Sequence, residues 1–381
     1  MRVITLGDLC DIVSGGTPAR SNPEFWNGGT IPWIKIGNIK QKYVNEADEF
    51  ITQAGLDGSS AKMLRKGTLL YTIFATLGDV GILNIDACTN QAIAGITIKD
   101  TKTVLPEYLY YYLHSKKKYV NDIGRGVAQN NINMTILRSF KVPLPEVSEQ
   151  KTIVELLDRV AQIINARQQQ VAALDDLIKA RFVEMFGDML INPKGLPEQR
   201  LDSLADIVSG ITKGRKTKAD ALYEVPYMAV SNVKDGYIDW TTVKTIMATT
   251  GEIAQYRLMP DDVLMTEGGD PDKLGRGAII HEPPKDCIHQ NHIFRVRLNQ
   301  DTLLPVYLAQ YLQQQKAKRY FLGCAKQTTG IASINMRQLS ALTVLVPPMN
   351  EQKEYADFVA QIDKSKFATL VFIHFCKKAA N

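Results

Sequence analysis

Several features that indicate an enzyme or a membrane protein are missing from this sequence of 381 residues. It contains no G-x-x-x-x-G-K-[ST] phosphate loop, no G-x-G-x-x-G opening a helix and no Asn-Pro-Pro-Tyr-like catalytic motif. No apolar run approaches the roughly 20 residues that cross a bilayer, and no apolar signal region follows Met1. These absences predict a protein without a membrane span that is not an enzyme by itself and needs no cofactor.

Cysteine is also scarce, and its distribution predicts neither disulfides nor a metal site. The five cysteines are odd in number and scattered, which is typical of a reduced, cytoplasmic protein. Cys287, His289 and His292 have a spacing that resembles metal ligands, but no fourth ligand accompanies them. The acidic cluster from Glu267 to Asp272 lies in a glycine-rich context that suits a turn. We therefore expect no metal.

One long stretch lacks the residues that break helices. From Glu149 to Gly187 there is no proline, and the only glycine is the last residue. Ser148 and Glu149 are suited to begin a helix and Gly187 to end it. Such a helix would be roughly 58 Å long, which suits a spacer between two domains. Its apolar residues follow a heptad seam, in which Arg167 and Arg181 are the only charged members: Ile153, Leu157, Val160, Ile164, Val171, Leu174, Ile178 and Met185.

The sequence on either side of this stretch is an internal duplication. Leu6 to Thr17 matches Leu201 to Thr212 at 8 of 12 positions, at an offset of 195 residues. Four further matches follow in the same order with offsets between 194 and 202: Ile31 to Val44 with Val225 to Ile238, Leu105 to Leu113 with Leu304 to Leu312, Ile132 to Met134 with Ile334 to Met336, and Glu149 to Lys151 with Glu351 to Lys353. Each copy therefore comprises a lobe followed by a helix.

Strands and one helix are expected in each lobe. The predicted strands of the first lobe are Ile31 to Ile39, Thr68 to Phe74, Val80 to Ile85 and Ile93 to Ile98. Those of the second lobe are Val225 to Val233, Asp262 to Thr266, Gly277 to His281 and Ile293 to Leu298. The predicted helices are Pro106 to Val120 and Pro305 to Phe321. The fold class is thus α+β, with two duplicated lobes separated by two long antiparallel helices related by pseudo-two-fold symmetry.

The domain boundaries follow the repeat and divide the charge unevenly. Residues 1–145, the first lobe, carry 16 basic and 12 acidic side chains, and residues 191–348, the second lobe, carry 19 and 16. The central helix, residues 146–190, carries 5 and 8, and the C-terminal helix, residues 349–381, carries 5 and 4. This distribution of charge is expected if the two lobes bind a polyanion and the acidic spacer between them does not.

The second long helix is expected to keep only part of the seam. Tyr355, Val359, Ile362 and Ile373 repeat the first seam, but Lys366 interrupts it. The following segment is apolar on nearly all sides, and the position matching Gly187 would be 389. We therefore expect a shortened return helix whose last turns pack differently.

These features together resemble the specificity subunit of type I restriction-modification systems. The resemblance covers essentially the whole chain, and its residues include the openings LGDLCDIVSGGTP and LDSLADIVSG and the junctions PLPEVSEQKTIVELLD and VPPMNEQKEYADFV. It implies a non-catalytic subunit with two target-recognition domains, each reading one half of a split double-stranded DNA sequence. It also implies that the helices seat two methyltransferase subunits and, in the full complex, restriction subunits.

Base recognition needs Arg, Lys, Asn or Gln side chains on loops, and each lobe offers candidates, most of them of these types. In the first lobe these are Arg20, Asn38, Lys40, Arg125, Gln129, Asn130 and Asn131. In the second they are Lys213, Arg215, Lys216, Lys218, Asn232, Lys234, Arg276, Lys326, Gln327 and Thr328. Asn38 and Asn232 are shared by both copies, which favours a role in the fold or at the DNA backbone.

The start of each long helix holds the candidates for partner binding. These residues are Glu149, Gln150 and Lys151, with Glu351, Gln352 and Lys353 in the second copy; helix capping would also explain the glutamates. A structural adaptor that binds proteins through both lobes, without DNA, is the alternative function. A self-contained restriction enzyme or methyltransferase is disfavoured by the missing motifs.

Overall fold

The computed structural model describes residues 2–124, 131–216, 221–269, 274–328 and 331–379, and it has the mixed helix and strand composition of an α+β fold. The chain forms two compact units, Met1–Ala166 with Ile373–Asn381, and Arg167–Phe372. The division between them runs through the long central helix. The domain boundaries at residues 145, 190 and 348 therefore stay predictions.

The described residues of the first lobe form three sheets. Its strands are β1 (Arg2–Thr5), β2 (Cys10–Ser14), β3 (Ile31–Ile34), β4 (Tyr43–Val44), β5 (Glu49–Ile51), β6 (Leu69–Thr72), β7 (Val80–Leu83), β8 (Cys88–Thr89), β9 (Ile93–Ile98) and β10 (Lys141–Leu144). The largest sheet has the order β2-β9-β6-β7-β4, the second β5-β3-β8, and the third β1-β10. Leu69 and Tyr71 on β6 and Ile96 on β9 are fully buried on one face of the largest sheet, where the lobe has its main core.

The second lobe repeats this arrangement. Its strands are β11 (Glu198–Arg200), β12 (Ala205–Ser209), β13 (Tyr223–Met228), β14 (Lys244–Ala248), β15 (Val263–Thr266), β16 (Gly268–Gly269), β17 (Gly277–Ile279), β18 (Ile288–His289), β19 (Ile293–Leu298), β20 (Lys326–Thr328), β21 (Ile331–Ser333) and β22 (Thr343–Leu345). The sheets β12-β19-β15-β17, β14-β13-β18 and β11-β22 correspond to the three sheets of the first lobe, and β16-β21-β20 is a further small sheet. The register agrees as well, since Leu69 pairs with Ile96 and Val263 with Val296. The predicted duplication is confirmed.

The short helices follow the same order in both lobes. In the first lobe they are α1 (Leu6–Leu9), α2 (Gln53–Asp57), α3 (Pro106–Ser115), α4 (Lys117–Gly124) and α5 (Met134–Arg138), with 3-10 turns η1 (Pro23–Phe25) and η2 (Ile36–Asn38). In the second they are α7 (Leu201–Leu204), α8 (Thr250–Tyr256), α9 (Pro305–Leu312), α10 (Gln315–Cys324) and α11 (Met336–Ser340), with η3 (Val230–Asn232) and η4 (Trp240–Thr242).

Two sequence predictions about these elements were wrong in extent. Each predicted helix after Pro106 and Pro305 is two helices, because the chain turns at Lys116 and again at Gln314, which is extended. The turn brings Val120 and Phe321 into the cores. The predicted strands Ile31 to Ile39 and Val225 to Val233 end early, at η2 and η3.

The two long helices are present and carry the predicted seam. The first, α6 (Val147–Phe186), has 40 residues, and Gly187 follows with a φ of +79°; the second, α12 (Met349–Ala379), has 31. Every apolar residue of the predicted α6 seam is buried or half-buried, whereas Arg167 is exposed. No helix in the described parts of the chain is long and apolar enough to cross a membrane.

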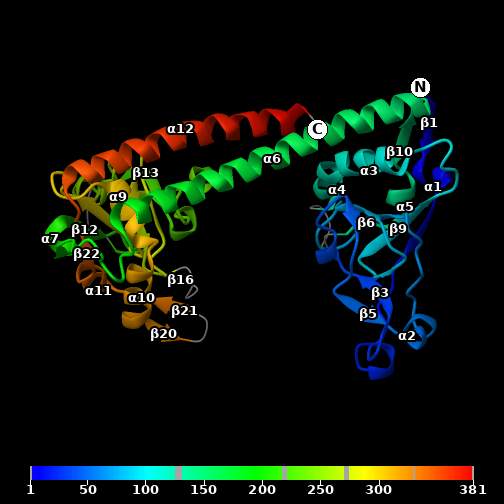
Figure 1. The fold of residues 1–381 in the computed structure, drawn as a ribbon, viewed down its shortest axis with the longest axis horizontal. Coiled ribbons are helices and arrows are strands. Elements are labelled where there is room, and N and C mark those ends of the chain that lie inside the picture. Colours follow the sequence, from blue (N-terminus) through cyan, green and yellow to red (C-terminus); the bar gives the residue numbers. More distant parts are fainter. Residues whose placement is uncertain (1, 125–130, 217–220, 270–273, 329–330, 380–381) are drawn as a thin grey trace. The chain divides into compact units, whose positions relative to one another are not determined.

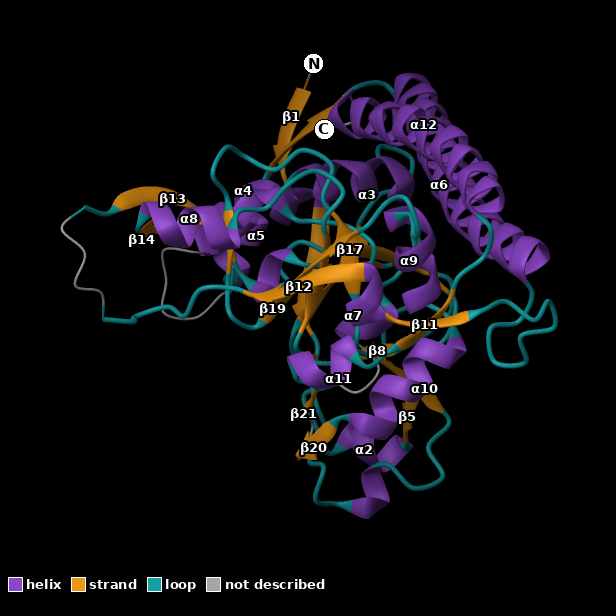
Figure 2. Ribbon diagram, turned by 90° about the vertical axis from the view of Figure 1, so that its left-hand side faces the viewer, coloured by secondary structure: helices purple, strands orange, loops and turns teal. Residues whose placement is uncertain are grey.

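Within the second unit, the end of α6 packs antiparallel to α12. Arg181 forms an ion pair with Glu354 at 2.7 Å, and Asp175 forms one with Lys366 at 2.7 Å. The contacts advance along α12 as they recede along α6, so the two helices run in opposite directions, as the colours of Figure 1 show. Figure 2 shows α6 and α12 side by side. Lys366 interrupts the apolar seam, but its ammonium group is paired with Asp175 at the helix interface.

Candidate nucleic-acid interface

Arg20 is held against two tryptophans on the first lobe. Its guanidinium carbon lies 3.7 Å from the ring centroid of Trp26 and 4.9 Å from that of Trp33, and its Nη2 is 2.5 Å from Glu49 Oε2. Lys35 also pairs with this carboxylate, and the two cations lower the pKa of Glu49. Cation–π and ionic contacts therefore orient Arg20, while about half of its side chain stays exposed.

The shared Asn38 and Asn232 shape the backbone. Asn38 Oδ1 accepts from the Lys35 backbone N–H at 2.8 Å, and Asn232 Oδ1 accepts from that of Ala229 at 2.9 Å. Asn232 is buried, and its amide also donates to Asp239 O and Thr242 Oγ1. The bonds to Lys35 N and Ala229 N close the 3-10 turns that follow β3 and β13; a role for either asparagine in DNA binding stays a prediction.

Arg215 is engaged inside the second lobe. Its Nε and Nη2 donate to the two carboxylate oxygens of Glu252 at 2.6 and 2.5 Å. This bidentate contact lowers the pKa of Glu252 to about 2, and Glu252 also closes a capping box with Thr249 at the start of α8. Arg215 therefore anchors the segment that carries its exposed neighbours Lys213 and Lys216.

The remaining candidates divide by exposure. Lys40 and Lys326 are exposed, and Asn131, Lys234 and Arg276 are half-buried. Gln327 and Thr328 belong to β20. Arg125, Gln129, Asn130 and Lys218 lie outside the described residues.

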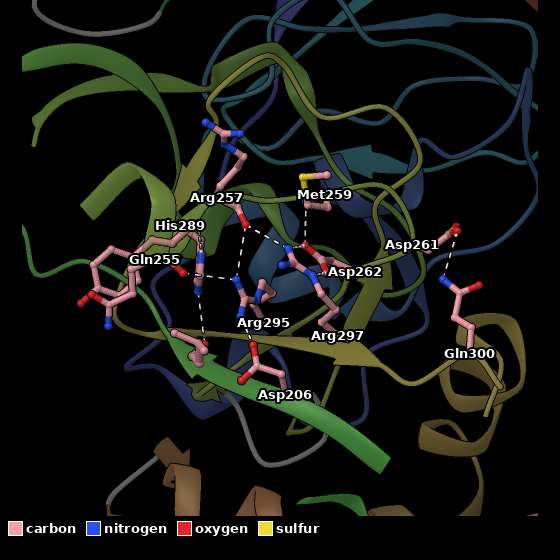
Figure 3. A network of polar contacts seen from close by, with 12 residues as sticks. Asp206, Gln255, Arg257, Met259, Asp261, Asp262, His289, Arg295, Arg297 and Gln300 are labelled. Atoms are coloured by element: carbon pink, nitrogen blue, oxygen red, sulfur yellow. Dashed lines mark hydrogen bonds and ion pairs between the residues drawn. The ribbon is translucent and has the colours of Figure 1, made fainter. Parts of the chain in front are cut away.

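Sequence reasoning missed a charged network within the second lobe (Figure 3). Arg295, on β19, has a nearly buried side chain that pairs with Asp206 and donates to the carbonyls of Gln255 and Arg257 at 3.2 and 3.4 Å. Arg297 donates two hydrogen bonds to buried Asp262, at 2.7 and 2.8 Å. The alternation of these arginines with apolar residues along β19 was the available signal, but it did not reveal that Arg295 points inward.

The residues that resembled a metal site have internal partners. The ring nitrogens of buried His289 lie 3.0 Å from Tyr256 O and 3.2 Å from Val208 O. Cys287 is buried, and His292 contacts Glu267. Asp270 and Asp272 lie outside the described residues, and among the described residues no group of three potential ligands is placed to hold a metal ion.

The middle residue of each Glu-Gln-Lys triplet joins a long helix to its lobe. Gln150 accepts from Leu105 N at 3.0 Å and donates to the carbonyls of Thr103 and Pro145 at 2.9 and 3.0 Å. Gln352 repeats all three bonds, with Leu304 N, Thr302 O and Pro347 O at 2.8, 3.1 and 2.8 Å. Both glutamines are fully buried. Their side chains are thus occupied inside the protein, whereas Glu149, Lys151 and Lys353 are exposed and Glu351 is half-buried.

The chain belongs to the family whose model is described as the type I restriction modification DNA specificity domain. This model matches residues 1–173 and 193–370. Specificity subunits of type I systems are non-catalytic, in agreement with the expectation that the chain is not an enzyme.

Individual relatives agree with this assignment. The type I restriction enzyme MjaIX specificity subunit of Methanocaldococcus jannaschii is 27% identical over 60% of this chain and 57% of its own length. The EcoKI specificity subunit of Escherichia coli K12 is 21% identical over 87% of this chain and 75% of its own. The chain therefore spans little more than half the length of the MjaIX subunit. A solved chain from work on assembly of the type I restriction-modification system covers 100% of this chain and 95% of itself, with a TM-score of 0.61 at 17% identity, and shows the same fold.

Proposed function

We propose that this chain is the DNA-specificity subunit of a type I restriction-modification enzyme, in which each lobe reads one half of a bipartite DNA target. The observation that carries the proposal is the duplicated lobe on either side of one continuous helix of 40 residues. Two linked readers bind a split site strongly only when the spacing of the lobes fits both halves. The helices would set that spacing and seat two methyltransferase subunits, with restriction subunits in the full complex.

The charge and exposure of the lobes support DNA as the ligand. Each lobe is net basic, and lysines such as Lys40, Lys213 and Lys216 are exposed on them. Electrostatic contacts with phosphates supply most non-specific affinity for DNA. The adaptor alternative has no comparable support in the charge of the lobes.

The long helices also expose apolar residues that suit helical partners. On α6, Leu156, Ile163 and Leu177 are 62%, 44% and 45% exposed, and their spacing in multiples of seven places them on one face. On α12, Phe367 and Leu370 are 70% and 50% exposed. An unpaired apolar stripe along a helix is typical of a surface that a partner covers.

Duplex binding tests the first part of the proposal. The full chain, alone and with its methyltransferase subunits, is titrated with a pool of random duplexes at several salt concentrations. We expect binding that weakens steeply with salt, with a slope of about −0.9 for each neutralised phosphate. Absence of binding to every duplex, with and without the methyltransferase subunits, would contradict the proposal and favour the adaptor.

The spacing is tested by changing the length of α6. A heptad inserted between Asn165 and Val171 lengthens the helix by roughly 10 Å, or about three base pairs of ~3.4 Å each. We expect mapping of methylated sites to show an altered gap, or no recognition, with unchanged half-site sequences. Replacing exposed Gln168 and Gln169 with alanine is the matched control, because it changes the same segment without changing its length. An unchanged gap in the insertion variant would show that α6 does not set the spacing.

A further inference from the structure

One ion pair of the first lobe is replaced by two cations in the second. In the first lobe Asp79 follows Gly78, which has a φ of +83°, and Asp79 Oδ1 lies 2.5 Å from Lys117 Nζ. Lys117 is on α4, three residues before the buried Val120. The pair is therefore internally neutral and closes the space between the start of β7 and α4.

The equivalent positions in the second lobe are identified by their backbone and packing. Gly275 has a φ of +73° and packs against Phe321, as Gly78 packs against Val120. Arg276 follows Gly275, and its carbonyl accepts from Thr266 N as that of Asp79 accepts from Thr72 N. Arg276 thus replaces Asp79. Lys318, three residues before Phe321 on α10, occupies the place of Lys117.

Arg276 and Lys318 line a hollow of about 270 Å³. Its apolar lining includes Leu274 and Leu312, and its polar lining also includes Asp235 and Gln313. The Asp235 carboxylate already accepts from Gln313 Nε2 at 2.7 Å. With two cations and one carboxylate, the hollow has a net positive charge.

Asp79 and Lys117 pair with each other in the first lobe, but Arg276 and Lys318 have no ion-pair partner among the described residues of the second lobe. Both side chains are half-buried, and no carboxylate of the described residues lies within 4.0 Å of either charged group. Arg276 Nε is buried without a hydrogen-bond partner in the described part of the chain. An unpaired buried donor is costly, so an anion that enters the hollow would be stabilised there.

We propose that Arg276 and Lys318 form a phosphate-binding site in the second lobe that holds a phosphodiester group of the DNA backbone. An arginine fork and a lysine ammonium are the side chains that most often contact phosphate oxygens, and the hollow has room for the group and its water. The source of the phosphate rests on the proposed function, but the binding chemistry does not. With this site, the second lobe would make a contact to the DNA backbone that the equivalent positions of the first lobe do not make.

The test compares charge-removing variants in the two lobes. Arg276→Gln, Lys318→Gln and the double variant are made in the full chain, with Lys117→Gln as the matched control, because it removes the same charge from the equivalent position. Arg276→Lys keeps the charge. We expect the double variant to bind duplex DNA about tenfold or more weakly, with a salt slope smaller by about 0.9, because the two cations neutralise one phosphate. Lys117→Gln and Arg276→Lys should retain most of the slope.

A second measurement does not depend on DNA. Inorganic phosphate or pyrophosphate is titrated into the wild-type chain and the double variant, and the amide shifts of residues 274–276 are followed by NMR. Saturable shifts in the wild type alone support the site. If they occur but duplex binding by the double variant is unchanged, the phosphate source is a small anion and the DNA assignment is overturned.

The remaining outcomes separate this inference from the proposed function. A wild-type chain that binds no duplex contradicts the proposed function, and the pyrophosphate titration still decides the site. A double variant with wild-type affinity, salt slope and pyrophosphate shifts overturns the site and leaves the proposed function intact. A variant that changes base preference at one half-site overturns a backbone contact, because phosphate contacts do not discriminate between bases.

Discussion

The two lobes share a fold but fill equivalent core positions with different chemistry. In the first lobe the sheet carries Gly95 on β9, and a hydroxyl pair joins Thr68 to Thr97 at 3.3 Å. In the second lobe the same register positions hold Arg295 and the ion pair between Asp262 and Arg297. The same backbone therefore accommodates nearly apolar side chains in one lobe and charged side chains at the equivalent positions of the other.

The surroundings of Gly95 and of Arg295 explain why each residue suits its own lobe. A Cβ built on Gly95 would lie 2.6 Å from Leu64 Cδ1, so the leucine already fills the space that a side chain there would need. In the second lobe, the backbone carbonyls of Gln255 and Arg257 face this space instead and accept from Arg295. A charge is retained in a core only where such acceptors satisfy it.

The lobes also differ in how they join their helices. Asp158 on α6 contacts Tyr111 and lies 2.5 Å from Lys42, which ties the first lobe to α6 by polar contacts. In the second unit Phe182 and Phe186 pack on Tyr307 and Tyr355, all of them fully buried, with ring centroids 5.0 to 5.7 Å apart. One attachment should depend on ionic strength and the other should not.

Removing Arg295 should have a large effect on the stability of the second lobe. Arg295→Ala leaves a cavity and a Gln255 carbonyl without its donor in the second lobe, while the Arg257 carbonyl keeps its hydrogen bond from Arg297. We expect a loss of about 3 kcal/mol or more in the free energy of unfolding of this lobe. Arg65→Ala is the control, because the 2.7 Å pair of Arg65 with Asp86 is on the surface of the first lobe and should contribute less than about 1 kcal/mol. Urea unfolding with hydrogen exchange at β19 measures the difference. Equal costs would show that the network does not stabilise the lobe.

His289 should make the second lobe sensitive to mild acid. Burial lowers its pKa to about 4, below the value of about 6.5 in the unfolded chain. Between these values the unfolded state binds a proton that the folded state does not, so stability is present above pH 6.5 and is lost as the pH falls towards 4. The loss at pH 4 is on the order of 3 kcal/mol.

The first lobe supplies the control for this prediction, because Thr89 occupies the equivalent position on β8. We expect His289→Thr to remove its own share, on the order of 3 kcal/mol, of the pH dependence of unfolding between pH 6.5 and 4, measured by urea titration at each pH. An unchanged dependence in the variant would assign the acid sensitivity to other groups.

Repetition and periodicity are why the overall fold was predictable from sequence. The spacing of the α6 seam predicted a helix that begins within two residues of the observed start at Val147 and ends at Gly187. The matching segments predicted that the second lobe repeats the elements of the first. Local breaks were harder to predict, because the turn at Gln314 depends on whether Phe321 reaches the core, which is a tertiary contact.

The candidate site was less predictable, because residue type does not reveal what a side chain contacts. Arg20 and Arg215 had the right chemistry for DNA, but the structure gives each a carboxylate partner within its own lobe. The importance of Arg276 and Lys318 appears only when the lobes are superposed by register, because they are far apart in sequence.

The two buried glutamines should matter equally, which tests the equivalence of the lobes. Gln150→Ala and Gln352→Ala each remove three hydrogen bonds to backbone groups, and we expect each to cost about 2 kcal/mol. Hydrogen exchange at the first turns of α3 and α9 reports the loss lobe by lobe. A cost at only one of them would mean that the long helices are attached by different means despite identical bonds.

The smallest effect is expected at the polar attachment of the first lobe. Asp158→Asn removes the charge that faces Lys42, and because Asp158 is partly exposed the cost should be about 1 kcal/mol or less at low salt. The difference between wild type and variant should shrink as ionic strength rises, since screening weakens the wild-type pair.

Phe182→Ala supplies the contrast with this polar attachment. It should cost about 3 to 5 kcal/mol by emptying a packed aromatic site, with no such convergence towards the wild type as salt rises. Hydrogen exchange of α3 and α9 at about 0.05 M and about 0.5 M salt, across which screening changes strongly, separates the two. If both variants respond to salt alike, the lobes are held to their helices by the same forces, because only a charged contact is screened while apolar packing is not.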